Sequence, residues 1–298
     1  MIKFKFIINP VPLRRKHLRI LDKILSELKR KKIGYDVEYT SKTKPAGMIA
    51  KSAIKDSEII VACGGDGTVM EVINGMYGSK RRLGILPFGT SNDFAKTLNM
   101  DDLQIAADKL IKGKHRKINL GIVEFNNGKK KMAFNSTSGI GFDAKMLMLN
   151  KRKFFIRLKS ILGGAVYPLA ALFYVFTHKG HHAEMIVKGQ KKKLKLFMLN
   201  ANFTKSMGGM KVTPLSHPTK DFGIFIVHDS SIFKKVFGFA WYAFSSKKVF
   251  FEEVEYFPNQ AEFSINSKEP MPLQLNGDFV GYTPAKFTIE KNAIELIC

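Results

Sequence analysis

Two turns of small residues, each containing glycine and placed directly after an apolar strand, constrain this chain more than any other feature. The first turn, residues 63–68, reads Cys-Gly-Gly-Asp-Gly-Thr and lies between a predicted strand at 58–62 and a predicted helix that begins near Val69. Three glycines in four positions let the backbone turn sharply and come close to a ligand. The helix that follows points free N–H groups and the positive end of its dipole at the turn. The pattern predicts a phosphate-binding loop, with an ordinary tight turn as the alternative.

A second turn of the same kind favours the phosphate-binding interpretation. The apolar strand at 83–86 leads into residues 87–95, which read Pro-Phe-Gly-Thr-Ser-Asn-Asp-Phe-Ala. Strand, small-residue turn and polar helix start therefore follow one another twice within about 40 residues. The helix after the first turn has an apolar stripe at its buried face, formed by Val69, Val72, Ile73 and Met76.

The first third of the chain alternates between strands and helices. Predicted strands at 4–8, 35–39, 58–62 and 83–86 are separated or followed by predicted helices near 18–28, 45–54 and 103–111. Such alternation indicates a mainly parallel sheet with helices on its faces. Ligands of these sheets bind beyond the carboxyl ends of the strands. Asn9, Thr40, Gly65 and Thr90 each follow a predicted strand, so we expect them to meet at one edge of the sheet.

The pattern changes near residue 116. Short alternating segments predominate at 117–124, 131–135, 183–187, 194–201, 223–227, 249–256 and 261–265, interrupted by an apparently helical region at 145–177. Short strands with alternating side chains predict an antiparallel sandwich. The fold class expected is thus an α/β domain followed by an all-β, sandwich-like second domain.

Charge indicates an anionic partner. Lys and Arg total 49 against 25 Asp and Glu, a net charge of +24. Such an excess attracts nucleic acid or an anionic membrane surface, although a generally lysine-rich proteome would also produce it. Basic and aromatic residues alternate at 151–159 and again within 232–251, which is typical of membrane-surface segments. The uncharged run at 161–177 is at the lower length limit for a membrane span, so we expect peripheral attachment, with a buried helix as the alternative.

Cysteine content and the N-terminus bear on the compartment. Only Cys63 and Cys298 are present, too few for a disulfide framework or a cysteine-rich metal site. A reducing compartment fits this content. The N-terminal residues 1–8 predict a strand and lack the three parts of a signal peptide, so we expect a cytoplasmic protein.

Taken together, the two turns resemble the diacylglycerol kinase catalytic domain family, which includes sphingosine kinases and soluble bacterial lipid kinases. The stretch 64–75 carries most of the resemblance, and 89–95 matches the second motif of the family. Residues 139–144, 200–203 and 208–211 resemble its later signatures, and Asn-Gly-Asp at 276–278 stands where the family has Asp-Gly-Glu. The resemblance covers nearly the whole chain. It implies an α/β nucleotide-binding domain like those of NAD kinase and diacylglycerol kinase at 1–120, a β-rich lipid-binding domain at 121–278, and a segment from about 279 to 298 that returns to the first domain.

The resemblance also implies an activity and a site. The expected activity is an ATP-dependent lipid kinase, which transfers the γ-phosphoryl group of ATP to the hydroxyl of a membrane lipid, with diacylglycerol as the first expectation. Asp66 is expected to organise Mg²⁺, directly or through water, and Asp278 to accept the proton of the lipid hydroxyl. The residues expected to bind the nucleotide are Asn9, Thr40, Gly64, Gly65, Asp66, Gly67, Thr68, Glu71, Gly89, Thr90, Asn92 and Asp93.

Three departures from the family pattern qualify these expectations. The opening loop reads Asn-Pro-Val-Pro-Leu at 9–13, so it lacks the family's glycine. Asp278 is one methylene shorter than the usual Glu, and as an isolated residue after Asn-Gly it would be read as part of a hairpin turn. Bacterial relatives hold a structural magnesium with Asp-Asp-Gly, whereas Asp221 is followed here by Phe222. Asp221 is the candidate ligand of such an ion, but the missing acid argues against a metal there.

Two other functions compete with a lipid kinase. NAD kinase shares the Gly-Gly-Asp-Gly-Thr turn, but the second turn and the basic–aromatic segments argue against it. A non-catalytic basic protein that binds membranes or nucleic acid would explain the charge and leave both turns unexplained. No specific nucleic-acid partner is expected, and the oligomeric state cannot be read from the sequence.

Overall fold

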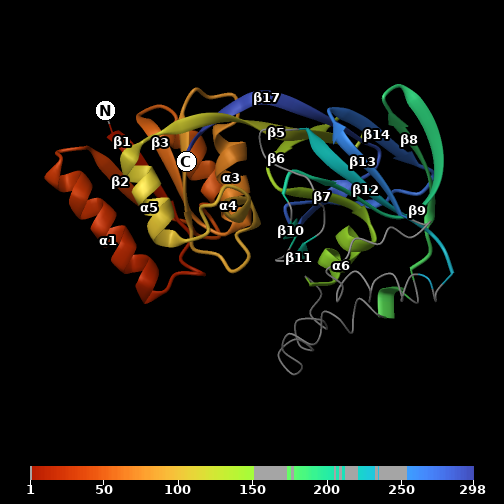
Figure 1. The fold of residues 1–298 in the computed structure, drawn as a ribbon, viewed down its shortest axis with the longest axis horizontal. Coiled ribbons are helices and arrows are strands. Elements are labelled where there is room, and N and C mark those ends of the chain that lie inside the picture. The colour runs from red at the N-terminus through yellow and green to blue at the C-terminus, as the bar shows by residue number, and fades with distance from the viewer. Residues whose placement is uncertain are drawn as a thin grey trace.

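The computed structural model describes residues 2–150, 173–175, 178–204, 206–207, 210–211, 221–231, 234 and 254–298. They form an α/β half and a β-rich half that lie side by side (Figure 1). The basic segment predicted at 151–159 lies outside the described residues. So do the uncharged run at 161–177 and the segment at 232–251, apart from residues 173–175 and 234. Within the described ranges, no helix is both long enough and apolar enough to cross a membrane.

The α/β half is built on parallel strands in the order β2-β1-β3-β4. Helices cover the faces of this sheet, so its central strand is buried almost throughout, as in other parallel sheets. The strands are β1 (Ile2–Ile8), β2 (Tyr35–Tyr39), β3 (Ser57–Gly64) and β4 (Arg82–Pro87), and the helices are α1 (Arg15–Arg30), α2 (Ala46–Ala53), α3 (Asp66–Met76), α4 (Asp93–Thr97) and α5 (Leu103–Lys112).

Helix α3 begins earlier than the sequence predicted. Its first residue is Asp66 and its N-cap is Gly65, whereas the apolar stripe placed the start near Val69. The stripe marks only the part of a helix that packs on the core. The first turn of α3 carries a carboxylate and a glycine, which leave no apolar signal. The carboxylate is favourable at the positive end of the helix dipole, and glycine is accepted at the N-cap, which is Gly65. The glycine turn and the helix therefore overlap.

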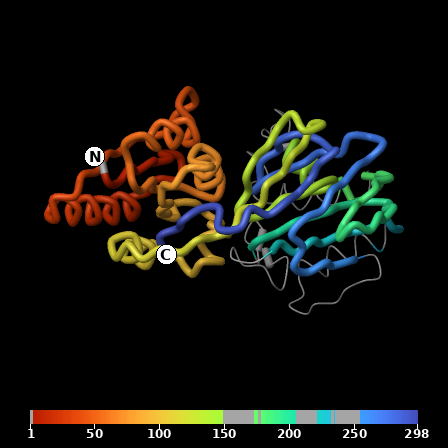
Figure 2. The backbone as a smooth tube through the Cα atoms, turned by 90° about the horizontal axis from the view of Figure 1, so that it is seen from above, coloured from red at the N-terminus to blue at the C-terminus, as the bar shows by residue number. Residues whose placement is uncertain are grey.

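Two long strands connect the halves. β5 (His115–Phe125) and β17 (Ala285–Ile297) pair antiparallel along most of their length, with a register shift between Glu290 and Ile294. Both run from one half into the other (Figure 2). The last residues of β17 also pair with β4, in parallel, where Leu296 lies opposite Leu83. The boundary expected near residue 120 thus falls inside a continuous strand, and the last residues of the chain extend the sheet of the α/β half.

The β-rich half is antiparallel and encloses its own apolar core. Strand β9 pairs with β7, β8 and β12, so the strands form a continuous curved sheet. Stacked and edge-on phenylalanine rings fill the core, among them Phe134, Phe222 and Phe263. The strands are β6 (Lys130–Phe134), β7 (Thr137–Gly141), β8 (His181–Val187), β9 (Gln190–Asn202), β12 (Phe222–His228), β13 (Val254–Gln260), β14 (Glu262–Ser267), β15 (Pro272–Leu275) and β16 (Asp278–Tyr282), with the short pair β10 (Ser206–Met207) and β11 (Met210–Lys211) and the helix α6 (Phe142–Asn150).

Candidate active site at the two glycine turns

The two glycine turns pack directly against each other. A Cβ added to Gly89 would lie 2.5 Å from the Cα of Gly65, a distance that real Cβ atoms do not reach. The N–H of Phe88 donates to the carbonyl of Gly64 at 2.9 Å and joins the two turns. A Cβ on Gly64 would in turn lie 2.4 Å from Oγ1 of Thr68. The glycines are thus required for the backbones to come this close, and the close approach brings the backbones of both turns to one edge of the sheet.

Asp66 fastens the first turn to the start of α4. Its Oδ2 accepts the N–H of Asp93 and its Oδ1 accepts the N–H of Phe94, both at 3.1 Å. Burial raises the pKa of Asp66, and the two backbone donors act against that shift. A carboxylate oxygen can accept more than one hydrogen bond, so both oxygens keep capacity for a water or a cation. Asp66 therefore has a structural contact that the sequence did not indicate.

The residue after β1 lies beside the first turn, and the residue after β2 lies beside the end of β1. Nδ2 of Asn9 donates to Oγ1 of Thr68 at 3.1 Å, and Oδ1 of Asn9 accepts the N–H of Val11 at 3.0 Å. The N–H of Thr40 donates to the carbonyl of Ile8 at 2.8 Å. The structure thus brings Asn9 into contact with the first turn at the carboxyl edge of the sheet, and places Thr40 next to the end of β1.

Within the second turn, Asn92 has a shaping role. It is buried, its φ of 47° is in the left-handed region, and its Nδ2 donates to the carbonyls of Pro87 and Gly89 at 3.3 and 2.9 Å. Its side chain therefore supports the turn from inside. Asp93 is also buried, whereas Thr90 is exposed at the tip of the turn.

Glu71 stands apart from the two turns. Its side chain is exposed on α3, and its Oε2 accepts the N–H of Ala46, the first residue of α2, at 2.9 Å. A carboxylate at this position satisfies a free backbone donor at the start of α2. Glu71 thus links α3 to α2 and does not contribute to the contact between the two turns.

A hairpin of the β-rich half brings Asp278 to the first turn. Asn276 and Gly277 have φ values of 48° and 89°, as a two-residue hairpin turn with right-handed twist requires, and Asp278 begins β16 directly after them. Oδ2 of Asp278 lies 3.7 Å from the position that a Cβ on Gly67 would occupy. The exposed carboxylate of Asp278 and the start of α3 are therefore neighbours, although they are far apart in the sequence.

Two amide side chains hold this hairpin in place, that of Gln274, which is buried, and that of Asn276, which is partly buried. Oδ1 of Asn276 accepts the N–H groups of Ser136 and Thr137 at 3.1 and 3.2 Å. The N–H of Gly277 donates to Oε1 of Gln274 at 2.8 Å. The sequence places Asn276 in a turn at the position of a family motif, and gives no signal for Gln274. An Asn-Gly pair shows that a turn exists, but does not show what the amide binds.

The hydrogen bonds continue from Gln274 to a buried acid. Nε2 of Gln274 donates to Oδ2 of Asp143 at 3.1 Å, and Nδ2 of Asn200 donates to the same oxygen at 2.7 Å. Burial raises the pKa of Asp143. A Cβ on Gly139 would lie 1.7 Å from this oxygen, so the carboxylate fits only over a glycine. The sequence marks the segment 139–144 as resembling a family signature but does not predict this role for Asp143.

The two acids expected to hold metal, Asp66 and Asp221, lie in different halves of the protein. Asp221 lies directly before β12 and is partly buried. Across the described part of the chain, no three His, Cys, Asp or Glu side chains gather as a metal-binding group. Magnesium keeps several waters and needs few protein ligands, and the spare acceptor capacity of Asp66 suits such an ion at the glycine turns.

Known proteins resemble this chain in sequence and in fold. Residues 3–123 match the family model of the diacylglycerol kinase catalytic domain. YtlR of Bacillus subtilis (strain 168), named as a candidate lipid kinase, is 28% identical over 306 residues, with 98% of each chain covered. The diacylglycerol kinase of the same strain is 27% identical over 297 residues, covering 96% of this chain and 93% of that protein. The crystal structure of a candidate diacylglycerol kinase from Bacillus anthracis str. Sterne has a TM-score of 0.77 at 20% identity and covers 99% of this chain and 97% of that one.

These findings confirm two predictions made from the sequence. The fold shared over nearly the whole chain is the predicted α/β domain with a β-rich second domain. The family match falls on the segment that contains both glycine turns, the residues on which the resemblance was based. The chain is therefore similar to the diacylglycerol kinase catalytic domain family over residues 3–123, and to bacterial proteins named as lipid kinases over nearly its whole length.

Proposed function

We propose that the protein transfers the γ-phosphoryl group of ATP to the hydroxyl of a membrane lipid, with diacylglycerol as the first acceptor to test. One observation carries the proposal. The carboxylate of Asp278, which comes from the β-rich half, lies beside Gly67 at the N-terminal end of α3. Phosphoryl transfer requires an acceptor hydroxyl aligned with a bound phosphate, and little covalent chemistry from the protein. A carboxylate at a phosphate-binding turn suits that requirement.

The phosphates of ATP would lie against the backbones of the two turns. Free N–H groups at the start of α3 and around Gly89 would donate to phosphate oxygens, aided by the dipole of α3. The exposed hydroxyl of Thr90 is available to the nucleotide, while Asn9 and Thr40 would flank it. Asp66 would hold Mg²⁺, directly or through water; the ion, when bound, neutralises phosphate charge.

Asp278 would then act as the general base. Its side chain is exposed, so a lipid hydroxyl can come within hydrogen-bond reach, as general-base catalysis requires. The hairpin turn is fixed by Asn276 and Gln274, and this restricts where the carboxylate can point. Each loss of such positioning lowers the rate even when the chemical group remains.

The acceptor stays in a bilayer, so the protein must come to a membrane surface. The net charge of +24 favours the anionic face of a membrane. We propose a cytoplasmic protein that binds such surfaces peripherally. The basic segment at 151–159 is the candidate for this contact, although it lies outside the described residues.

A transfer assay tests the proposal. The protein would be incubated with radiolabelled ATP and Mg²⁺ and with vesicles containing diacylglycerol, monoacylglycerol, a sphingoid base or a polyprenol, and in parallel with NAD. We expect label in one lipid, and little label with the Asp278→Asn variant. Faster labelling of NAD than of any lipid would replace the proposal by an NAD kinase activity.

A further inference from the structure

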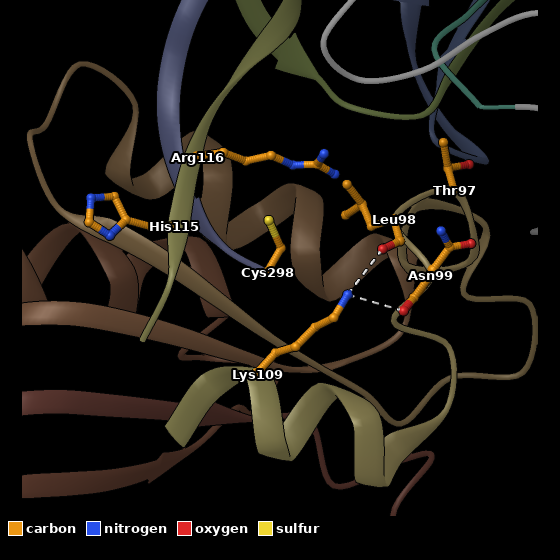
Figure 3. A pocket seen from close by; sticks show the side chains of 7 residues that line it. All are labelled: Thr97, Leu98, Asn99, Lys109, His115, Arg116 and Cys298. Atoms are coloured by element: carbon orange, nitrogen blue, oxygen red, sulfur yellow. Dashed lines mark hydrogen bonds between the residues drawn. The ribbon is translucent and has the colours of Figure 1, made fainter. Parts of the chain in front are cut away.

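A cavity of about 370 Å³ lies at the end of α4 away from the second glycine turn (Figure 3). Its wall comes from the last turn of α4, from α5, from the start of β5 and from the end of the chain. Asp93, at the other end of α4, belongs to the candidate active site, so α4 separates the two places. The lining residues are Thr97, Leu98, Asn99, Lys109, His115, Arg116 and Cys298.

Arg116 is the first sign that this cavity has a ligand. Successive side chains of β5 point to opposite faces of the sheet, so Arg116 shares a face with the buried Ile118. A cation thus occupies an inward-facing position. Its Nε is buried without a hydrogen-bond partner. Within the described ranges the guanidinium also has no ion pair. Arg116 is half-buried, and a buried polar atom without a partner is costly, so an anion in the cavity that accepts a hydrogen bond from Nε would remove that cost.

Lys109 supplies a second charge. From α5 its Nζ reaches the carbonyls of Leu98 and Asn99 at 3.5 and 3.3 Å, and Figure 3 shows Lys109 and Arg116 converging toward Leu98. These hydrogen bonds are longer than usual, so the ammonium can still donate to a ligand. Of the side chains that the structure describes, no carboxylate forms an ion pair with either cation. Glu295 lies near the rim instead, 3.7 Å from His115.

We propose that this cavity is a second anion site, which binds a phosphomonoester. A guanidinium matches two phosphate oxygens with parallel N–H groups, and an ammonium adds a point charge from another side. Thr97 and Asn99 add polar groups to the wall, and the volume leaves room for a small organic group beside the phosphate. A soluble phosphorylated metabolite and the headgroup of phosphatidic acid present the same chemistry. The proposal does not depend on the role of Asp278.

Cys298 provides a reporter inside the cavity. The chain has one other cysteine, Cys63, which is fully buried and whose pKa is raised by burial. Alkylation of the native protein by iodoacetamide, followed by mass spectrometry of the modified peptide, should therefore report on Cys298. An excess of Mg²⁺ and a non-hydrolysable ATP analogue would keep glycerol 3-phosphate from the glycine turns. We expect glycerol 3-phosphate to slow alkylation of Cys298 with a saturable dependence on its concentration.

Matched variants test the assignment. Arg116→Gln should weaken this protection by about tenfold or more, the usual effect of losing a charge-assisted contact to phosphate, and Lys109→Gln should weaken it as well. Lys117→Gln removes an exposed charge from the next residue of β5 and should leave the protection unchanged. Full protection in both Arg116→Gln and Lys109→Gln, or equal loss in Lys117→Gln, would overturn the proposal. Lys109→Gln and Lys117→Gln decide the matter if Arg116→Gln does not fold.

The source of the phosphate needs separate arms. Vesicles containing phosphatidic acid would replace glycerol 3-phosphate, with phosphatidylcholine vesicles as the control. Protection by phosphatidic acid alone would assign the site to a lipid headgroup, and protection by glycerol 3-phosphate alone to a soluble ligand. Equal protection by phosphatidylcholine vesicles, with none from glycerol 3-phosphate, would show general shielding at a membrane and overturn the site.

Discussion

Replacing Gln274 by Met should slow phosphoryl transfer without weakening ATP binding. Gln274 is 1% exposed, accepts the N–H of Gly277 and donates to Asp143. Met has a similar shape and cannot make either hydrogen bond. The N–H of Gly277 would lose its acceptor, while Asp143 would keep its contact with Asn200. The main defect is therefore expected directly beside Asp278.

The size of the effect follows from these contacts. Gly277 is exposed, so its freed N–H can bond to water, and loss of the hydrogen bond costs about 0.5–1.5 kcal/mol. If the turn moves so that Gly277 finds water, Asp278 moves with it. A displacement of about 1 Å in a reacting group can lower a rate by roughly 10²-fold. We therefore expect kcat to fall by about that factor, with a melting temperature only a few degrees lower.

Steady-state kinetics with a saturating lipid acceptor would measure this, with kcat and the KM for ATP determined separately. Gln104→Met is the matched control, because Gln104 bonds only Asp108 on α5 among the described residues, away from the hairpin. A wild-type kcat in Gln274→Met, together with a lower melting temperature, would refute the positioning argument. A large rise in the KM for ATP would instead show that the glycine turns had been disturbed.

Other substitutions test the remaining roles. Asp278→Asn should lower kcat by roughly 10²–10⁴-fold, the usual contribution of a general base, and Asp278→Glu should stay active; an Asn variant with unchanged kcat would place the base elsewhere. Asp66→Ala should nearly abolish transfer, with circular dichroism to verify folding, and near-normal turnover would remove the metal-organising role. Because burial raises the pKa of Asp143 above its ordinary 3.8, wild-type stability should fall as pH rises from about 4 through the raised pKa; urea unfolding should show a smaller fall in Asp143→Asn, and identical profiles would contradict the shift. Replacing the five basic residues of 151–159 by glutamine should weaken co-sedimentation with anionic vesicles, and binding that survives both this change and high salt would exclude a peripheral, charge-driven contact.

Local patterns in the sequence were sufficient to predict the secondary structure near the glycine turns. Strand β3 could be identified from its apolar run, and α3 from its stripe, because period and burial are properties of neighbouring residues. The Asn-Gly pair at 276–277 was recognisable as a hairpin for the same reason, since few residues adopt two successive left-handed conformations. The first residue of α3 was misplaced, because its polar first turn gives no periodic signal.

Tertiary structure alone decided which of these features meet. The proximity of Asp278 to Gly67, and the hydrogen bond from Gln274 to Asp143 across 131 positions, join segments with no local relation. The inward position of Arg116 follows from the alternation of β5, but the cavity beside it exists only because α4, α5 and the last strand end together. Sequence periodicity therefore determined the elements and the glycine turns, because these depend on contacts within a few residues. The carboxylates, amides and cations that surround them were set by packing between distant strands, for which one sequence carries no local signal.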